Sequence, residues 1–235
     1  MVDVEVGAQR SEIGWKWARS IYRAVQRLRL RLWPGDQRLH IRLIDGTPIM
    51  VLPGVFDGIR LRSGALLAWT FAALSIPASA QVLDLGTGSG IGAIFAARRA
   101  ARVVATDINP QAVWCAQMNA EALHLDHKLE TRAGDLFEPV HGEQFDVILF
   151  NPPFYRGQPR DMTDCAWRSP DVFDRFLQEL PVHLRPGGFA LIVLSTDGDI
   201  ADALWSAKHL VLRPVRRRDL INEILTVYEI RVYDR

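Results

Sequence analysis

The stretch VLDLGTGSGIGA, residues 82–93, decides the fold of this chain of 235 residues. An apolar run that contains Asp84 leads into three glycines, Gly86, Gly88 and Gly90, and a second apolar run with helical spacing follows them. Glycines between a strand and a helix let the backbone approach a ligand closely. The stretch therefore predicts the first strand, loop and helix of a nucleotide-binding α/β unit.

Strand and helix patterns alternate through the rest of the chain. The runs RVVATD at 102–107 and FDVILF at 145–150 predict strands, and residues 110–123 predict a helix with Pro110 in its first turn. We expect Arg216–Arg218 to be a solvated turn, followed by a last, alternating strand, EILTVYEIRVY. Alternation of this kind is typical of a mostly parallel sheet with helices on both faces. We therefore expect an α/β fold with a Rossmann-like, doubly wound sheet.

The composition bounds the class of protein. Hydrophobic residues make up 49% of the chain and the formal net charge is +1, so a core can form and no global attraction to nucleic acid or membrane is indicated. Two cysteines are too few for a disulfide framework. The start MVDVEVGAQRSE lacks the pattern of a signal peptide, and Pro77 splits the longest uncharged segment, 63–83, which argues against a membrane span. We expect a soluble, cytoplasmic protein.

Residues 1–60 predict an N-terminal extension, a helix and a β-hairpin, ahead of a domain at 61–235. Between about residues 12 and 33, apolar side chains recur at spacings of three and four, opposite a basic face. That helix either binds a phosphate backbone or, in the interpretation we favour, docks on the core or forms a homodimer. A turn at Asp45-Gly46 predicts the hairpin, and Ser63 is a candidate N-cap for the helix that follows.

The glycine stretch fits two classes of cofactor. Residues 88–93 satisfy the dinucleotide pattern G-x-G-x-x-G/A with Asp107 about twenty residues on, as in a nicotinamide-dependent oxidoreductase. Two features favour another nucleotide: Asp84 is a costly carboxylate in an apolar strand unless it meets a partner, and Gly86 begins the loop earlier. The sequence here resembles the class I S-adenosylmethionine-dependent methyltransferases, whose first motif is an acidic residue followed by G-x-G-x-G. The resemblance covers Gln81 to the C-terminus and implies seven strands, the last of them antiparallel.

This resemblance implies cofactor-binding residues at the carboxyl ends of the strands. Asp107 would accept hydrogen bonds from both ribose hydroxyls, with Ile108 packed on the adenine. Asp135 would face the adenine amino group, and Asp84 would lie near the amino end of the methionine part. A solvated strand-end carboxylate or a helix cap is the alternative for Asp107 and Asp135. The full set is Asp84, Gly86, Thr87, Gly88, Gly90, Asp107, Ile108, Asp135, Leu136 and Asn151.

A second motif, FNPPF at 150–154, follows the predicted strand at 145–150. A planar amine is a poor nucleophile, and acceptors that hold its N–H bonds would orient it. The Asn151 side-chain oxygen and the Pro152 carbonyl can accept, and Phe154 can stack on a base. Catalysis would then be mostly positioning without a strong general base, which fits the absence of a His or Cys constellation beside the motif; we also expect no metal. The motif matches the (N/D)-P-P-(F/Y) signature of amino-methyltransferases; a strand merely ended by prolines is the alternative.

The sequence leaves the substrate open among RNA, protein and small molecules. The run that begins PGVF resembles ribosomal RNA guanine methyltransferases, with Arg62-Ser63-Gly64 where that family has an acidic residue. Release-factor glutamine methyltransferases carry the motif with tyrosine and have a larger N-terminal domain. A small-molecule N-methyltransferase and a non-catalytic binding module are further alternatives. The second motif and the long loop after it supply candidate substrate-binding residues, namely Pro153, Tyr155, Arg156, Arg160, Trp167 and Arg168.

Overall fold

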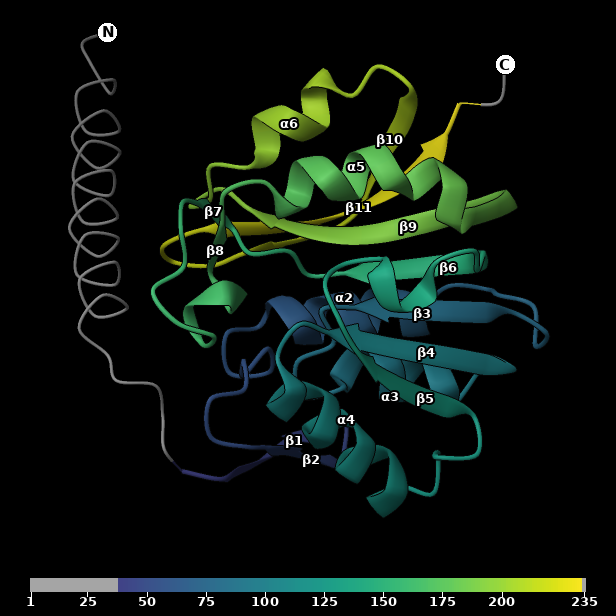
Figure 1. The fold of residues 1–235 in the computed structure, drawn as a ribbon, viewed down its shortest axis with the longest axis vertical. Coiled ribbons are helices and arrows are strands. Elements are labelled where there is room, and N and C mark those ends of the chain that lie inside the picture. The colour runs from purple at the N-terminus through teal and green to yellow at the C-terminus, as the bar shows by residue number, and fades with distance from the viewer. Residues whose placement is uncertain (1–37, 234–235) are drawn as a thin grey trace, which may run out of the picture.

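A seven-stranded sheet organises the chain (Figure 1). The computed structural model describes residues 38–233, and the strand order is β10-β11-β9-β6-β3-β4-β5. The strands are β3 (Gln81–Leu85), β4 (Arg102–Asp107), β5 (Leu129–Ala133), β6 (Phe145–Phe150), β9 (Leu184–Ser195), β10 (Leu210–Asp219) and β11 (Ile224–Val232). Strands β3, β4, β5, β6 and β9 run parallel, and β11 is antiparallel to both of its neighbours. The predicted Rossmann-like α/β sheet with an antiparallel last strand is confirmed.

Helices cover both faces of the sheet, as Figure 1 shows. One face carries α2 (Ser63–Ala72), α3 (Ile91–Ala97) and α4 (Pro110–Ala122), and the other carries α5 (Val172–His183) and α6 (Ala201–Ser206). The central strands are apolar on both sides because helices bury both of their faces. Two hydrophobic clusters, one on each face of the sheet, hold the three layers together.

The predicted hairpin is present and packs on helix α4. Strand β1 (His40–Ile44) pairs with β2 (Thr47–Val51) around Asp45-Gly46, whose positive φ angles of 48° and 74° suit a tight antiparallel turn. The Asn119 amide of α4 donates to the Met50 carbonyl at 2.7 Å and accepts from the Met50 N–H at 2.8 Å. The hairpin is therefore fixed to the layer of helices that borders the glycine loop.

Other expectations have different outcomes. The helix expected at 12–33, with its phosphate-binding and homodimer interpretations, lies outside the described residues, and a domain boundary at residue 60 stays a prediction. The expectation of a turn at Arg216–Arg218 is wrong, because these residues lie in β10 at the edge of the sheet, although Arg216 and Arg217 are exposed as expected. Charged side chains on an edge strand discourage pairing with other chains. Within residues 38–233, no helix is both long enough and apolar enough to cross a membrane.

Candidate active site

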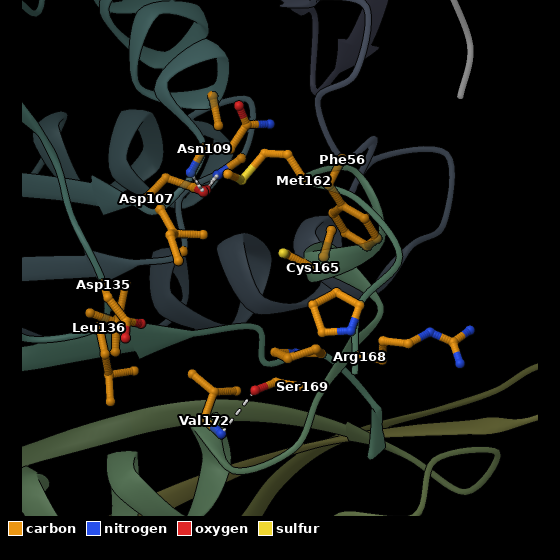
Figure 2. A pocket seen from close by; sticks show the side chains of 18 of the residues that line it. Phe56, Asp107, Asn109, Asp135, Leu136, Met162, Cys165, Arg168, Ser169 and Val172 are labelled. Carbon is orange, nitrogen blue, oxygen red and sulfur yellow. Dashed lines mark hydrogen bonds between the residues drawn. The ribbon is translucent and has the colours of Figure 1, made fainter. Parts of the chain in front are cut away.

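A pocket of about 310 Å³ lies at the carboxyl ends of β3, β4, β5 and β6, where open α/β sheets bind their ligands. Figure 2 shows Asp107, Asp135 and Leu136 in its walls, with Met162 and Cys165 of the loop after β6 facing it. The predicted site residues that line the pocket are Gly86, Gly88, Asp107, Ile108, Asp135, Leu136, Asn151, Pro153 and Arg168. The predicted residues outside its lining are Asp84, Thr87, Gly90, Pro152, Phe154, Tyr155, Arg156, Arg160 and Trp167.

The glycine loop brings bare backbone to the pocket wall. Gly86, Gly88 and Gly90 have φ angles of 64°, 56° and 84°, a left-handed region that side chains with a Cβ rarely adopt. Gly90 has a second reason to be glycine, because a Cβ there would lie 2.9 Å from the Cα of Ala116 in α4. The first two glycines therefore shape the pocket, and Gly90 allows α3 and α4 to pack closely.

Asp107 ends β4 with its carboxylate oriented by backbone amides. Its Oδ2 accepts from the Gly88 N–H and its Oδ1 from the Asn109 N–H, both at 2.9 Å (Figure 2). Burial raises the pKa of Asp107, and the N–H groups of Asn109 and Gly88 oppose that rise. A carboxylate has about four lone-pair sites, so acceptor capacity remains for a ligand hydroxyl.

Asp84 lies beneath the glycine loop rather than in the pocket wall. Its Oδ2 accepts from the Thr87 hydroxyl at 2.6 Å and from the Ala93 N–H at 2.8 Å, which ties the loop to the start of α3. Burial raises the pKa of Asp84 to about 6, against the hydrogen bonds from Thr87 and Ala93, and the neighbouring Asp107 raises it further. The structure thus supplies the partners that a buried carboxylate needs. Its place beside the methionine part stays a prediction.

Asp135 meets an arginine that the sequence did not single out. Arg175 of α5 places its Nη1 2.7 Å from one carboxylate oxygen of Asp135 and its Nη2 3.3 Å from the other. Both residues line the pocket, as do Leu136 and Ile108, the latter 44% exposed. An adenine amino group would therefore share Asp135 with Arg175. No local signal marks Arg175, because 40 residues separate the two partners.

The side-chain amide of Asn151 has one bonded and one unbonded group. It follows β6 directly, and its Nδ2 donates to the hydroxyl oxygen of Ser63 at 3.2 Å. Its Oδ1 is buried and has no hydrogen-bond partner among the described residues. The expectation that Ser63 caps α2 is wrong: Arg62, with a φ of 70°, holds the N-cap position without a side-chain bond, and Ser63 is the first helical residue.

The loop after β6 closes over the pocket and is braced from within. Asp164 is buried, and its carboxylate pairs with Arg160 at 3.1 Å and with Arg168 at 3.0 Å. The Trp167 ring meets the Phe56 ring edge-on, with centroids 5.2 Å apart. Phe56 also lines the pocket, and the PGVF run was its signal in the sequence. The loop is therefore an ordered wall of the site.

Two predicted substrate residues hold this loop to the body of the protein. The Tyr155 hydroxyl donates to Asp197 at 2.7 Å, and the Arg156 N–H donates to Asp199 at 2.7 Å. The Arg156 guanidinium also pairs with Asp174 of α5, which is half-exposed. These contacts give both residues a structural role, and their contact with a substrate stays a prediction.

The residues of the pocket fit S-adenosylmethionine. Bare backbone at Gly86 and Gly88 leaves room for an extended chain, Asp107 keeps acceptor capacity for hydroxyls, and Ile108 and Leu136 offer apolar surface to a planar base. A sheet of this order with these groups at its strand ends defines the class I S-adenosylmethionine-dependent methyltransferases. Within this class, the chain belongs to the methyltransferase small domain family, whose model matches residues 46–210.

Relatives of this chain are RNA and protein methyltransferases. A release factor glutamine methyltransferase of Cereibacter sphaeroides is 40% identical over 138 residues, 52% of this chain and 48% of the relative. A ribosomal RNA small subunit methyltransferase C of Alcanivorax borkumensis is 30% identical over 146 residues, 62% of this chain and 42% of the relative. The chain spans about half the length of the curated relatives it matches.

A solved structure shares the fold. A 16S rRNA guanine methyltransferase of T. thermophilus, in complex with AdoMet and guanosine, matches with a TM-score of 0.65 and 24% sequence identity. The match covers 83% of this chain and 50% of that chain. Because the identity is low, this likeness supports the architecture and leaves the substrate to be argued from the site.

Proposed function

We propose that this chain transfers a methyl group from S-adenosylmethionine to the nitrogen of a planar exocyclic amine or amide. The observation that carries the proposal is the Asn151 side-chain oxygen, which is buried and has no hydrogen-bond partner among the described residues. Asn151 stands in the pocket wall at the end of β6. A buried acceptor without a donor costs about 1–3 kcal/mol, so a donor brought by the substrate would account for it.

In this proposal, each of the predicted site residues named below has a defined role. When bound, the cofactor supplies a methyl group on a sulfonium, which is already a strong electrophile. Asn151 accepts one N–H of the substrate and the Pro152 carbonyl accepts another, so that the nitrogen lone pair is held in one direction. Asp107 holds the ribose. Phe154 is half-buried against the core and lies outside the pocket lining, one residue after Pro153, so its ring would have to turn toward the pocket to stack on the planar group. Positioning does most of the work, and the proton leaves after methylation.

RNA is the substrate class that we infer first. The relative from Alcanivorax is named as a ribosomal RNA enzyme, and the run that begins at Pro53 resembles guanine methyltransferases of that kind. The relative from Cereibacter, at 40% identity, favours a glutamine side chain as the second candidate. Both groups present a planar N–H donor of the kind that Asn151 would accept. A cytoplasmic location and a homodimer stay predictions.

Transfer of label from the cofactor's methyl group tests the proposal. The wild-type protein and Asn151→Ala are incubated with lysate of a strain that lacks the protein, and RNA, protein and small molecules are then separated. We expect label in RNA that depends on Asn151. Label in protein alone would favour the glutamine substrate, and label in small molecules alone would move the enzyme to metabolism.

A parallel thermal-shift measurement separates the enzyme classes. Protection by S-adenosylhomocysteine without protection by NAD(H) is the expected result, and the reverse would support an oxidoreductase. Protection by S-adenosylhomocysteine without Asn151-dependent label in any of the three pools would instead make the chain a cofactor-binding module, and the proposed function would fail.

A further inference from the structure

The hydroxyl of Ser63 is in direct contact with the amide of Asn151. Its oxygen accepts a hydrogen bond from the Asn151 Nδ2 at 3.2 Å, across 88 residues of sequence. Ser63 is 2% exposed, so solvent does not compete for this contact. Ser63 is the first helical residue of α2, one position past the N-cap that Arg62 holds, so its hydroxyl is not in the capping position. The hydroxyl therefore serves another residue.

In the structure, this contact occupies the donor side of the Asn151 amide. A serine hydroxyl can accept from Nδ2 or donate to Oδ1, so it holds the amide in place, and the N–H donors of an amine substrate favour the orientation seen here. A primary amide carries an acceptor oxygen on one side and two N–H donors on the other. With Nδ2 held by Ser63, the acceptor Oδ1 is left without a partner among the described residues. If the amide turned over, its N–H donors would take the place of Oδ1 and would face the N–H donors of an amine substrate. The observed orientation is the one that can hold an amine.

The backbone around Ser63 is built to keep it in place. Arg62 adopts a φ of 70°, a left-handed conformation that costs a residue with a Cβ about 1 kcal/mol or more. A Cβ on Gly64 would lie 3.1 Å from the Cα of Gly58, so the start of α2 is packed closely against the preceding loop. The Ala65 N–H also donates to the Gly58 carbonyl at 3.2 Å. Backbone strain at Arg62 and close packing at Gly64 thus flank the residue that contacts Asn151.

From these observations we propose that Ser63 is a positioning residue, which holds the Asn151 amide by its Nδ2 and so leaves the oxygen in place to accept a hydrogen bond from the substrate N–H. This inference rests on the proposed function. It also gives a role to a position at which the chain departs from its resemblance to guanine methyltransferases, where Arg62-Ser63-Gly64 replaces an acidic pattern.

The test compares Ser63→Ala with a matched control in the same helix. Thr70→Val removes another buried hydroxyl of α2, one that donates to the Leu66 carbonyl and does not touch Asn151. We expect Ser63→Ala to lower kcat about tenfold, the effect of one lost hydrogen bond, with the Kd for S-adenosylhomocysteine within about twofold of wild type. Thr70→Val should leave kcat within about twofold. An unchanged kcat in Ser63→Ala would overturn the proposal.

A double-mutant cycle separates positioning from a general loss of structure. In an Asn151→Ala background, Ser63→Ala should lower kcat no further, because the amide that it orients is gone. An undiminished tenfold drop in that background would show that Ser63 acts through something else, and would overturn the proposal.

A readout without catalysis keeps this inference distinct from the proposed function. The side-chain NH₂ signal of Asn151, assigned by its loss in Asn151→Ala, should exchange with solvent faster in Ser63→Ala than in wild type or Thr70→Val. Equal exchange in all three would overturn the positioning role. If wild type labels no pool, the proposed function fails by itself, and the exchange measurement still decides whether Ser63 holds the amide.

Discussion

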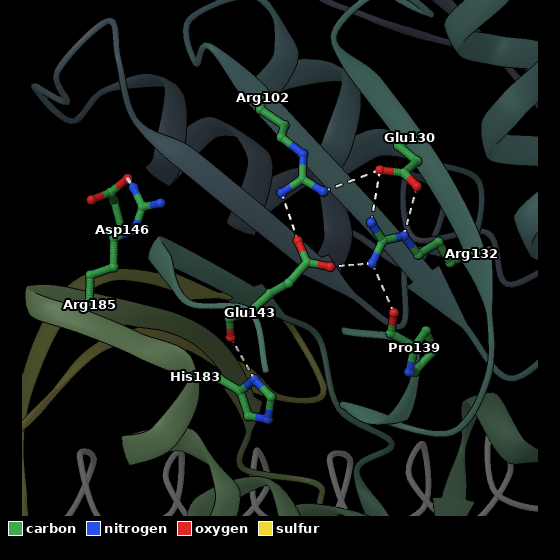
Figure 3. A network of polar contacts seen from close by, with 8 residues as sticks. All are labelled: Arg102, Glu130, Arg132, Pro139, Glu143, Asp146, His183 and Arg185. Carbon is green, nitrogen blue, oxygen red and sulfur yellow. Dashed lines mark hydrogen bonds and ion pairs between the residues drawn. The ribbon is translucent and has the colours of Figure 1, made fainter. Parts of the chain in front are cut away.

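The two ends of the sheet treat their polar groups in opposite ways. At the carboxyl ends of the strands, burial raises the pKa of both Asp84 and Asp107, and the Asn151 oxygen has no partner among the described residues. Around the amino ends of β4 and β6 and along β5, two carboxylates and two guanidinium groups form the network of Figure 3, made of Arg102, Glu130, Arg132 and Glu143.

In that network the carboxylates are stabilised as ions. Hydrogen bonds from Arg132 and Arg102 outweigh the cost of burial and lower the pKa of Glu130. Burial alone would raise the pKa of Glu143, but Arg132 and Arg102 bond to it and leave its pKa below the usual value. The network therefore pairs its charged groups with one another and stabilises the fold. The carboxyl ends of the strands instead keep acceptors available for a ligand.

Replacement of Asn151 should have the greatest effect on catalysis and little effect on stability. Asn151→Ala should lower kcat by at least about 100-fold, the scale of losing one group that holds the reacting atoms. The free energy of unfolding should fall by no more than about 1 kcal/mol, because the substitution removes the bond from Nδ2 to Ser63 but otherwise takes away an acceptor that has no protein donor. Steady-state kinetics and urea unfolding check the two halves.

A second buried amide is the matched control for that prediction. Asn119 bonds to the backbone of Met50 on both sides and to the Ser89 carbonyl at 2.9 Å. Asn119→Ala should therefore cost about 2–3 kcal/mol of unfolding free energy. Equal losses of stability in Asn119→Ala and Asn151→Ala would show that the Asn151 oxygen is not reserved for a ligand.

The buried carboxyl of Asp84 should make the free energy of unfolding depend on pH. Because the folded pKa of Asp84, about 6, exceeds its ordinary value of 3.8, the folded state holds a proton that the unfolded state has released. The free energy of unfolding should fall as the pH rises through that window, by up to about 3 kcal/mol. Asp84→Asn, which mimics the neutral acid, should lose this slope in urea titrations between pH 4 and 6. A slope that persists in the variant would remove Asp84 as its source.

Elements and positions that depend on local spacing could be predicted from the sequence, and contacts between distant segments could not. The strands β3, β4 and β6, the role of Pro110 and the position of Asp107 depend on local spacing, and all lie where the patterns indicate. The bond between Ser63 and Asn151 spans 88 residues, and no periodicity reports it. Strand β10 was not predicted, because Pro214 and a run of arginines interrupt the alternation typical of a buried strand. An edge strand tolerates both features.

A smaller effect tests the ligand end at Asp107. Asp107→Ala should raise the Kd for S-adenosylhomocysteine about 30-fold, through the loss of the ribose contacts and of the bonds that hold Gly88 and Asn109. Asp146→Ala is the control at the far end, since Asp146 bonds to the Gln81 N–H at 2.7 Å outside the pocket. Calorimetry should find its Kd unchanged. A Kd within about threefold of wild type in Asp107→Ala would reject the ribose role.

The network around Glu143 should give the smallest change in the free energy of unfolding, with a pH dependence opposite to that of Asp84. Glu143→Gln should cost about 1 kcal/mol of unfolding free energy near pH 7, because Glu143 bridges Arg102 and Arg132. A depressed pKa stabilises the folded state above the ordinary value of 4.5, so the difference from wild type should vanish as the pH falls below it. Asp126→Asn, at an exposed carboxylate, is the control and should change the free energy of unfolding near pH 7 by less than about 0.5 kcal/mol. Lowering the pH would thus reduce the stability contributed by Glu143 and increase the stability of the end that holds Asp84. A stability difference between Glu143→Gln and wild type that grows toward acid would refute this contrast.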